Sequence, residues 1–224
     1  MSISGKTRML IKGLLVCGIM SSLLCVGTDI IAAMSLEGYS YTDQAVSELT
    51  AIGAPTRPLV VSLLIAVAVL VIAFSAGVLL SAGKKHALRI TGILLTIYGV
   101  VSLISFFFPM NPRGTEQSFT GLMHLISGGV AVLLIMLFIG FGSAAHGKGF
   151  RIYSVITILA ILVFGSLAAM QGARVAAGLP TPWFGVIERV SYYSPMLWIL
   201  VFAAILLRAQ GNKLSTTYQG QEGL

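Results

Sequence analysis

The sequence predicts an all-α membrane protein, a polytopic bundle of six transmembrane helices with both termini in the cytoplasm and a short amphipathic helix in an outer loop. Three observations support this prediction. Hydrophobic residues make up 57% of the chain and charged residues only 9%, against about 25% charged residues in an average soluble domain. The apolar residues gather in six long runs, and most basic residues lie on one side of them. So few charges cannot cover a surface that faces water.

Each of the six apolar runs is long enough to cross a hydrocarbon core of about 30 Å as a helix. A backbone inside lipid has no water to bond, so it must satisfy its own hydrogen bonds, and runs this apolar are therefore predicted as helices. Together they form one membrane domain over residues 1–224, with a long outer loop over 35–57 and a cytoplasmic tail over 208–224. The predicted spans are about 10–33, 58–82, 88–108, 121–142, 152–171 and 184–207.

The basic residues predict the orientation of the bundle. Lys and Arg are enriched in cytoplasmic loops, so the side that carries ten of them is predicted to face the cytoplasm. The ten are Lys6, Arg8, Lys12, Lys84, Lys85, Arg89, Lys148, Arg151, Arg208 and Lys213, and the other side holds Arg57, Arg113, Arg174 and Arg189. We therefore expect a multi-pass protein of a cell membrane, a prokaryotic plasma membrane, with membrane lipids as partners. Nucleic acid is not an expected partner, because no basic cluster is interleaved with aromatic residues.

The first span carries an acid, Asp29, about a turn and a half inside its outer end. An acid in a membrane span costs free energy unless it faces protein or water. Gly18, Ser22, Cys25 and Asp29 share one helix face, and this stripe of small and polar residues predicts the face that packs inward. Two roles stay open for Asp29: it handles a proton in a functional site, or a neighbouring arginine holds it for structure.

The outer loop over residues 35–57 is longer than most connections in compact proteins, and such loops are functional or disordered. Apolar residues at Ala45, Val46, Leu49 and Ile52 have helical spacing. We therefore predict a short amphipathic helix over about 42–52, lying on the outer mouth of the bundle.

His124 lies just inside the outer end of the fourth span, on a face with Ser127, Gly128 and Ala131. A histidine there can accept a proton near neutral pH, and a hydrogen bond that links two helices is the alternative. His86 and His146 belong to the opposite side of the membrane. No histidine cluster forms, so we expect no metal site and no cofactor.

Glu188 and Arg189 begin the sixth span, and Tyr192 shares a helix face with Glu188. Neighbouring residues on a helix point about 100° apart, so the two charges are predicted to meet different partners. We expect Arg189 to pair with Asp29 and Glu188 to pair with Arg57. An alternative interpretation treats Trp183, Tyr192 and Tyr193 as an aromatic belt at the membrane surface.

Residues of the outer loop complete the candidate site. Glu48 is expected over the same mouth as Arg57, and Ser47 has no nucleophile motif around it. No catalytic residue is assigned, and the candidates for proton transfer are Asp29, His124 and Glu48. The candidates for ligand binding are Arg57, Arg189, Glu188, Tyr192, Tyr41 and Ser47.

A set of short motifs extends over most of the chain. It comprises Asp29, Tyr39-Ser40-Tyr41, Ser47-Glu48-Leu49, Gly53-Ala54-Pro55-Thr56-Arg57-Pro58, Phe108-Pro109-Met110, His124 and Glu188-Arg189-Val190. Together these motifs resemble the prokaryotic membrane proteins grouped as the domain of unknown function 998 family. The resemblance implies an integral membrane protein and assigns no activity.

Three classes of function stay open. In the first, a polar, charged pocket at the outer face binds or processes a lipid headgroup or a small solute, with Arg57 and Arg189 holding a phosphate. The second is a proton-coupled transporter of small solutes that uses Asp29 and His124 as relays. The third is a non-catalytic scaffold. Charges near one face favour the first class, because transporters place polar groups near mid-membrane.

The sequence leaves two further questions open. Whether the protein is an enzyme is undecided, because no set of nucleophile, base or metal ligands is complete. The oligomeric state is undecided too, because stripes of small residues pack helices equally well within one chain or between two.

Overall fold

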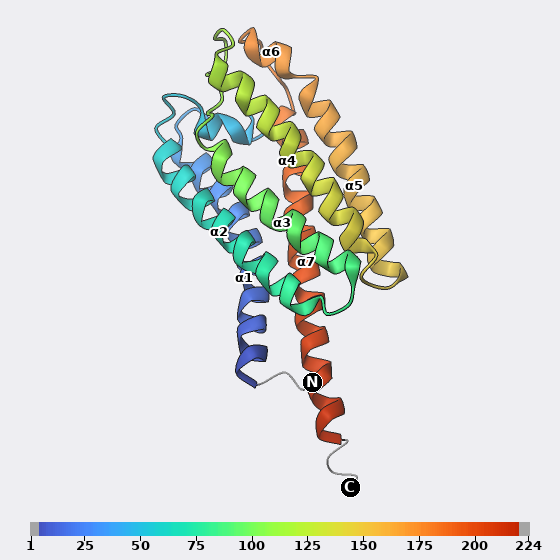
Figure 1. Cartoon of the computed structure of the whole chain (residues 1–224). Coiled ribbons are helices and arrows are strands. Elements are labelled where there is room, and N and C mark those ends of the chain that lie inside the picture. The colour runs from blue at the N-terminus through green and yellow to red at the C-terminus, as the bar shows by residue number, and fades with distance from the viewer. Residues whose placement is uncertain (1–4, 220–224) are drawn as a thin grey trace.

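The computed structural model describes the backbone of residues 5–219 and the side chains of residues 5–211. The described residues form an all-helical bundle (Figure 1). Its elements are α1 (Gly5–Ser35), the 3-10 helix η1 (Val46–Thr50), α2 (Arg57–Ser81), α3 (His86–Ser105), α4 (Phe119–Ser143), α5 (Lys148–Ala169), α6 (Gly172–Ala176) and α7 (Phe184–Gln219). Six of these helices, α1 to α5 and α7, are long and apolar enough to cross a membrane. The predicted fold class is confirmed, and the protein is a multi-pass helical membrane protein.

The long helices pack as a ring that is incompletely closed. α1 packs against α2 and α7, α2 against α3, α3 against α4, and α5 against α7. α4 packs mainly against α3 and has much less contact with α5 and α7. The bundle is therefore loosest between α4 and the pair formed by α5 and α7. We call the end that holds the α2–α3 and α4–α5 connections the inner end, following the predicted orientation, which stays a prediction.

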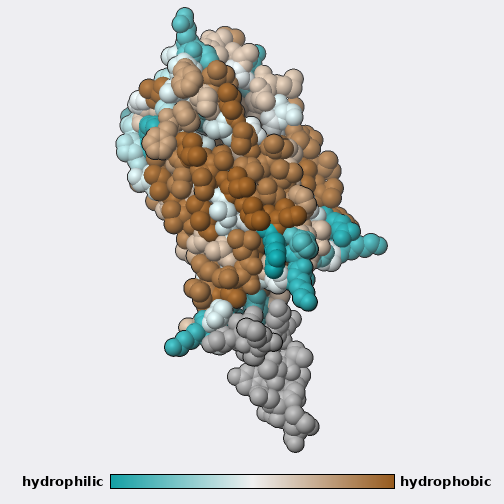
Figure 2. All heavy atoms as spheres, viewed as in Figure 1, coloured by the Kyte–Doolittle hydropathy of each residue, from teal (hydrophilic) through white to brown (hydrophobic). Residues whose placement is uncertain are grey.

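Apolar side chains cover the outside of the bundle between its two ends (Figure 2). Leu125 and Leu133 on α4 and Leu159 and Val163 on α5 are among the large apolar residues that are more than half exposed. An apolar surface of this extent would be unstable in water, and it fits contact with lipid tails. Polar residues gather toward the ends (Figure 2).

The inner half of the bundle is filled with aromatic side chains. Trp198 and Phe202 of α7 are fully buried and stack with their ring centroids 4.7 Å apart. The indole nitrogen of Trp198 donates a hydrogen bond of 2.9 Å to Ser154 Oγ on α5. Gly142 of α4 admits the indole, because a Cβ at that position would lie 2.6 Å from the ring. Close ring packing and a satisfied indole N–H make this half dense.

The outer loop and the last helix differ from the predicted boundaries. The predicted helix over 42–52 is reduced to η1 (Val46–Thr50), with Leu49 buried and Ile52 exposed. Ser40 and Asp43 exchange side-chain hydrogen bonds just before it, and such local bonds compete with a helix. The short helix α6 was not predicted. α7 continues to Gln219, past the start of the predicted tail over 208–224, of which residues 220–224 lie outside the described part.

Candidate functional site

A buried ion pair joins the first and last membrane helices near the outer end. Arg189 donates through Nε to Asp29 Oδ2 at 2.8 Å and through Nη2 to Asp29 Oδ1 at 2.9 Å. Asp29 is 2% exposed and Arg189 is 3% exposed. The predicted pairing of these two residues is confirmed, and so is the inward stripe of α1, whose four members are all buried. A bidentate pair of this kind satisfies both charges without water.

The remaining donors of Arg189 bind the outer loop. Nη1 donates to the carbonyl oxygens of Tyr41 at 2.7 Å and Gln44 at 3.2 Å, and Nη2 donates to the Tyr39 hydroxyl at 2.8 Å. The guanidinium also lies over the Tyr41 ring, 3.5 Å from its centroid. Nη1 bonds the Gly185 carbonyl as well, so all five N–H groups of a guanidinium are engaged. Arg189 therefore has no donor left for a ligand's phosphate, and its role here is to join α1, the loop and α7.

Three tyrosines complete this cluster, which we call the Asp29–Arg189 cluster: Asp29, Arg189, Tyr39, Tyr41 and Tyr193. Tyr193 donates to Asp29, and its hydroxyl also lies 2.8 Å from that of Tyr41. Burial raises the pKa of the Tyr39 phenol, against the opposing effect of Arg189. The phenol therefore stays protonated and donates to the Gln44 and Ala45 carbonyls at 3.1 and 2.8 Å.

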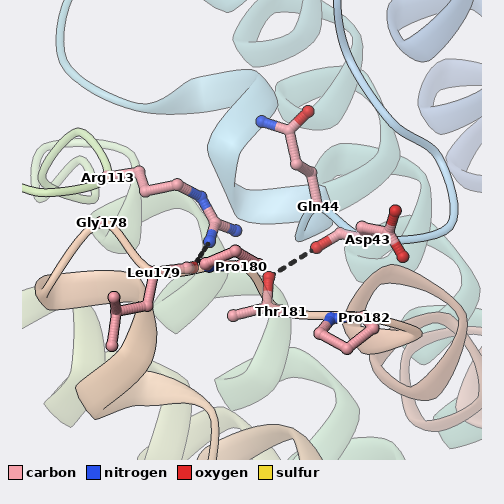
Figure 3. Close-up of a pocket in the computed structure, with 8 residues that line it drawn as sticks. All are labelled: Asp43, Gln44, Arg113, Gly178, Leu179, Pro180, Thr181 and Pro182. Atoms are coloured by element: carbon pink, nitrogen blue, oxygen red, sulfur yellow. Dashed lines mark hydrogen bonds between the residues drawn. The ribbon is translucent and has the colours of Figure 1, made fainter.

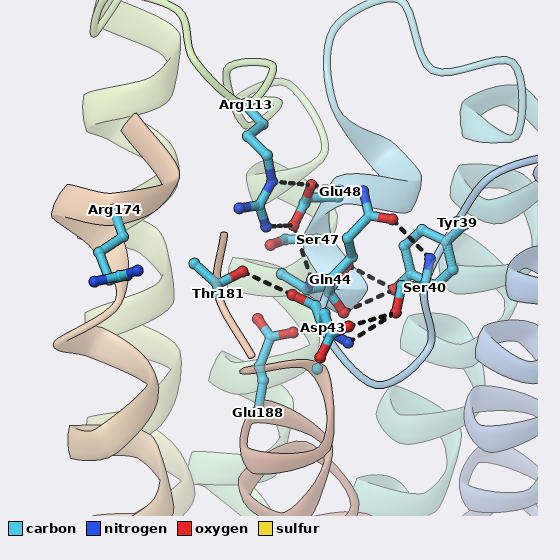
Figure 4. Close-up of polar contacts among 12 residues, drawn as sticks. Tyr39, Ser40, Asp43, Gln44, Ser47, Glu48, Arg113, Arg174, Thr181 and Glu188 are labelled. Carbon is cyan, nitrogen blue, oxygen red and sulfur yellow. Dashed lines mark hydrogen bonds and ion pairs between the residues drawn. The ribbon is translucent and has the colours of Figure 1, made fainter. Parts of the chain in front are cut away.

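A second ion pair lies closer to the outer surface (Figure 4). Glu48 of η1 accepts from Arg113 Nη2 at 2.7 Å and Nε at 3.1 Å, and Glu48 is 8% exposed. Glu48 also accepts from the Ala45 N–H and from Gln44 Nε2. Arg113 reaches across to the Leu179 carbonyl at 3.0 Å. This pair therefore joins the outer loop to the α3–α4 and α6–α7 connections.

A shallow pocket of about 370 Å³ lies beside Arg113 on the outer surface (Figure 3). Its floor is residues 178–182, and Thr181 Oγ1 donates to the Asp43 carbonyl at 2.8 Å. Backbone and side-chain polar groups of this pocket already bond one another. It contains none of the residues that the sequence singled out as candidates.

The predicted pairing of Glu188 with Arg57 is wrong. Glu188 Oε2 accepts a short hydrogen bond from the Val46 N–H at the start of η1. Arg57 donates through Nη1 to the Thr50 carbonyl at 2.8 Å and through Nη2 to the Phe106 carbonyl at 3.2 Å. Glu188 therefore binds a backbone N–H at the start of η1, whereas Arg57 binds backbone carbonyls at the ends of η1 and α3. Among residues 5–211, neither side chain forms an ion pair.

A cavity of about 390 Å³ occupies the outer half of the bundle, where α4 stands away from α5 and α7. Polar side chains line it, and five of them are sequence-predicted candidates: Ser47, Arg57, His124, Glu188 and Tyr192. Apolar residues line the rest, among them Val71, Ile135, Ile161 and Met196. Val71 follows Arg57 by fourteen residues on α2, which is about 21 Å along a helix axis. The cavity therefore extends from polar groups near the outer end to apolar groups near mid-membrane.

His124 presents a hydrogen-bond acceptor in this cavity. Its Nδ1 lies 3.1 Å from the Phe108 carbonyl oxygen. A carbonyl only accepts, so Nδ1 carries the proton in the neutral ring and Nε2 has a free lone pair. Nε2 has no hydrogen-bond partner within residues 5–211, and His124 is a lining residue of the cavity.

The structure thus divides the predicted site residues into three groups. Ser47, Arg57, His124, Glu188 and Tyr192 line the cavity. Asp29, Arg189 and Tyr41 belong to the neighbouring buried cluster, and Glu48 pairs with Arg113. Sequence reasoning missed Arg113, although it was one of four basic residues on the acid-rich side. In the described part of the chain, no three His, Cys, Asp or Glu side chains gather as a metal site would need.

Comparison with known proteins adds one finding. The model of a protein family described as protein of unknown function (DUF998) matches residues 19–205. The matched region contains the whole lining of the cavity and both ion pairs. No curated protein and no solved structure matches the chain.

Proposed function

Because the chain belongs to the DUF998 family, which assigns it no activity, we propose a function from the cavity itself. The protein binds a membrane lipid of the outer leaflet, with the phosphate of the headgroup at Arg57 and an acyl chain in the apolar part of the cavity. The observation that supports this proposal is the lining of the cavity, which carries charged side chains near the end predicted to be outer and apolar side chains toward the middle of the bundle. In the predicted orientation, this is the order that an outer-leaflet lipid requires. A binding site of a few hundred cubic ångströms with few polar groups is typical for an apolar ligand.

Arg57 is the residue best placed for the phosphate. It begins α2 at the outer end, and it is the cavity's only arginine. Its two hydrogen bonds to carbonyls fix its position, and they leave further N–H groups unused. A cation beside an apolar cavity is costly unless an anion compensates it, and a guanidinium binds phosphate through two parallel hydrogen bonds.

The direction of access favours a lipid over a solute dissolved in water. Gly128 and Val132 of α4 line the cavity and are also exposed at the side of the bundle, Val132 by 40%. A Cβ added at Gly128 would meet nothing within 4 Å. The outer end, in contrast, is covered by η1, which the Glu48–Arg113 pair and Glu188 fasten in place. A molecule in the surrounding lipid can therefore enter from the side.

Native mass spectrometry of the full chain, purified in mild detergent, tests the proposal. We expect a phospholipid to remain bound to the wild type and to be lost from Arg57→Ala. Arg174→Ala is the matched control, because Arg174 lies at the same end and donates only to the Pro180 carbonyl. Gly128→Phe should fill the cavity and reduce the bound fraction. Gly140→Phe should not, because Gly140 also has open space around it but does not line this cavity.

Two results would overturn the proposal. One is a wild-type protein that carries no lipid after purification from membranes. The other is an Arg57→Ala variant that retains as much lipid as Arg174→Ala does.

A further inference from the structure

The head of the cavity carries two ionisable side chains of opposite sign, Arg57 and Glu188, and neither forms an ion pair among residues 5–211. Arg57 bonds only the carbonyl oxygens of Thr50 and Phe106. Glu188 accepts only from the Val46 N–H, through Oε2, so Oε1 has no partner within residues 5–211. Two other acids near this end are paired with arginines, Asp29 with Arg189 and Glu48 with Arg113. Among the charged residues of this end that have no ion-pair partner within residues 5–211, Arg57 and Glu188 are the two that line the cavity.

Arg57 and Glu188 do not neutralise each other although they line the same cavity. No nitrogen of Arg57 lies within 4.0 Å of an oxygen of Glu188. Opposite charges in a partly dehydrated space attract strongly, but backbone groups at the two ends of η1 hold these two apart. A ligand that carries both an anion and a cation can satisfy both of them at once.

The third polar group at the head of the cavity specifies the kind of cation. His124 Nε2 is an acceptor, because Nδ1 donates to the Phe108 carbonyl. Glu188 and His124 therefore both offer lone pairs, and an ammonium that carries N–H bonds can donate to both. A trimethylated ammonium has no N–H bond and cannot. A headgroup that ends in hydroxyl groups would leave the Glu188 charge without a counter-ion.

We infer that the bound lipid is an aminophospholipid, whose phosphate lies at Arg57 and whose protonated primary amine lies at Glu188 and His124. This inference rests on the proposed function and specifies its ligand. Hydrogen bonds to charged groups are stronger than those between neutral groups, so loss of the amine contact should weaken binding by about tenfold or more.

The test offers the delipidated full chain an equimolar mixture of phosphatidylethanolamine, phosphatidylglycerol and phosphatidylcholine with identical acyl chains, read by native mass spectrometry. We expect phosphatidylethanolamine to be enriched about tenfold over each of the others. Glu188→Gln keeps an oxygen for the Val46 N–H but removes the charge, so it should still bind lipid and lose the enrichment. Glu37→Gln is the control, because Glu37 is an exposed acid of the outer loop that does not line this cavity.

The outcomes distinguish the preference for an aminophospholipid from the proposed binding of a lipid. Lipid that binds without preference, or with a preference for phosphatidylglycerol, overturns the inference and leaves the proposed function standing. Equal binding of phosphatidylcholine and phosphatidylethanolamine overturns the assignment of a primary amine. A Glu188→Gln variant that keeps the wild-type preference also overturns the inference. No lipid in any arm overturns both.

Discussion

The inner and outer halves of the bundle are built from the same helices but differ in how closely these helices pack. On α4, Gly142 lets the Trp198 ring approach, whereas Gly128 borders the open space of the cavity. In the inner half, aromatic rings fill the space between helices, whereas in the outer half polar and apolar side chains line a space that no side chain fills. Small residues therefore allow close packing where a large side chain faces them, and leave room where none does. The comparison indicates that close packing of aromatic rings stabilises the inner half, whereas the outer half combines a buried ion pair with the cavity.

The largest effect on stability is expected from the inner half. Trp198→Ala removes a fully buried indole that contacts Phe138, Phe150 and Phe202, and it should lower the free energy of unfolding by about 4 kcal/mol. Leu197→Ala, at an exposed position one residue away, should change it by less than about 1 kcal/mol. Thermal unfolding in detergent measures both. Equal losses in the two variants would show that the buried indole adds no more to stability than an exposed side chain does.

A smaller effect is expected at the Asp29–Arg189 cluster, and none at the cavity. Asp29→Asn leaves the buried Arg189 charge without its partner, so it should destabilise the protein by about 3 kcal/mol. Arg57→Met breaks no ion pair among the described residues and should leave the unfolding temperature of the delipidated protein nearly unchanged. If Arg57→Met were as damaging as Asp29→Asn, Arg57 would be a structural residue and the distinction between cluster and cavity would fail.

The smallest expected effect is a dependence of the stability on pH, caused by His146 at the inner end. Burial lowers the pKa of His146, which lies between α4 and α5, and the charge of Lys85 lowers it further. The unfolded chain then binds a proton more readily than the folded one, so stability is full above the ordinary histidine pKa of about 6.5 and falls as the pH drops below it. The unfolding temperature should decline between pH 7.5 and pH 5.5.

The variant His146→Phe tests whether His146 causes this pH dependence. Its aromatic side chain keeps the edge contacts with Phe150 and Phe202 and removes the titrating group. The decline should become shallower in His146→Phe and persist in His86→Phe, because His86 is exposed at the start of α3. An unaltered decline in His146→Phe would assign the titration to another residue.

Local patterns in the sequence predicted the features that depend on one helix at a time. The apolar runs predicted the six membrane helices, and the polar stripe on α1 predicted that Asp29 faces inward to Arg189. The partner of Glu48 was not predictable, because Arg113 lies in a connection whose path depends on the rest of the fold. Glu188 was assigned to Arg57 because charge alone was considered, whereas the free N–H of Val46 lies closer.

The cavity itself could not be predicted from the sequence. It exists because α4 packs against α3 and leans away from α5 and α7, and this geometry is set by contacts between helices that are distant in sequence. The small residues at Ser127, Gly128 and Ala131 were visible, but their spacing is equally typical of close helix packing. Only the three-dimensional arrangement distinguishes the two interpretations.

The span of 160 residues between Asp29 and Arg189 has a consequence for biogenesis. A ribosome that adds about 5–20 residues per second delivers the acid of the first helix to the translocon roughly 8 to 30 seconds before the guanidinium that neutralises it. During that interval the Asp29 carboxylate has no arginine partner. Protonation, contact with the insertion machinery or late insertion of α1 would each lower the cost of placing it in the membrane. Because α7 supplies the partner of Asp29, the buried ion pair between α1 and α7 forms only after α7 has been synthesised.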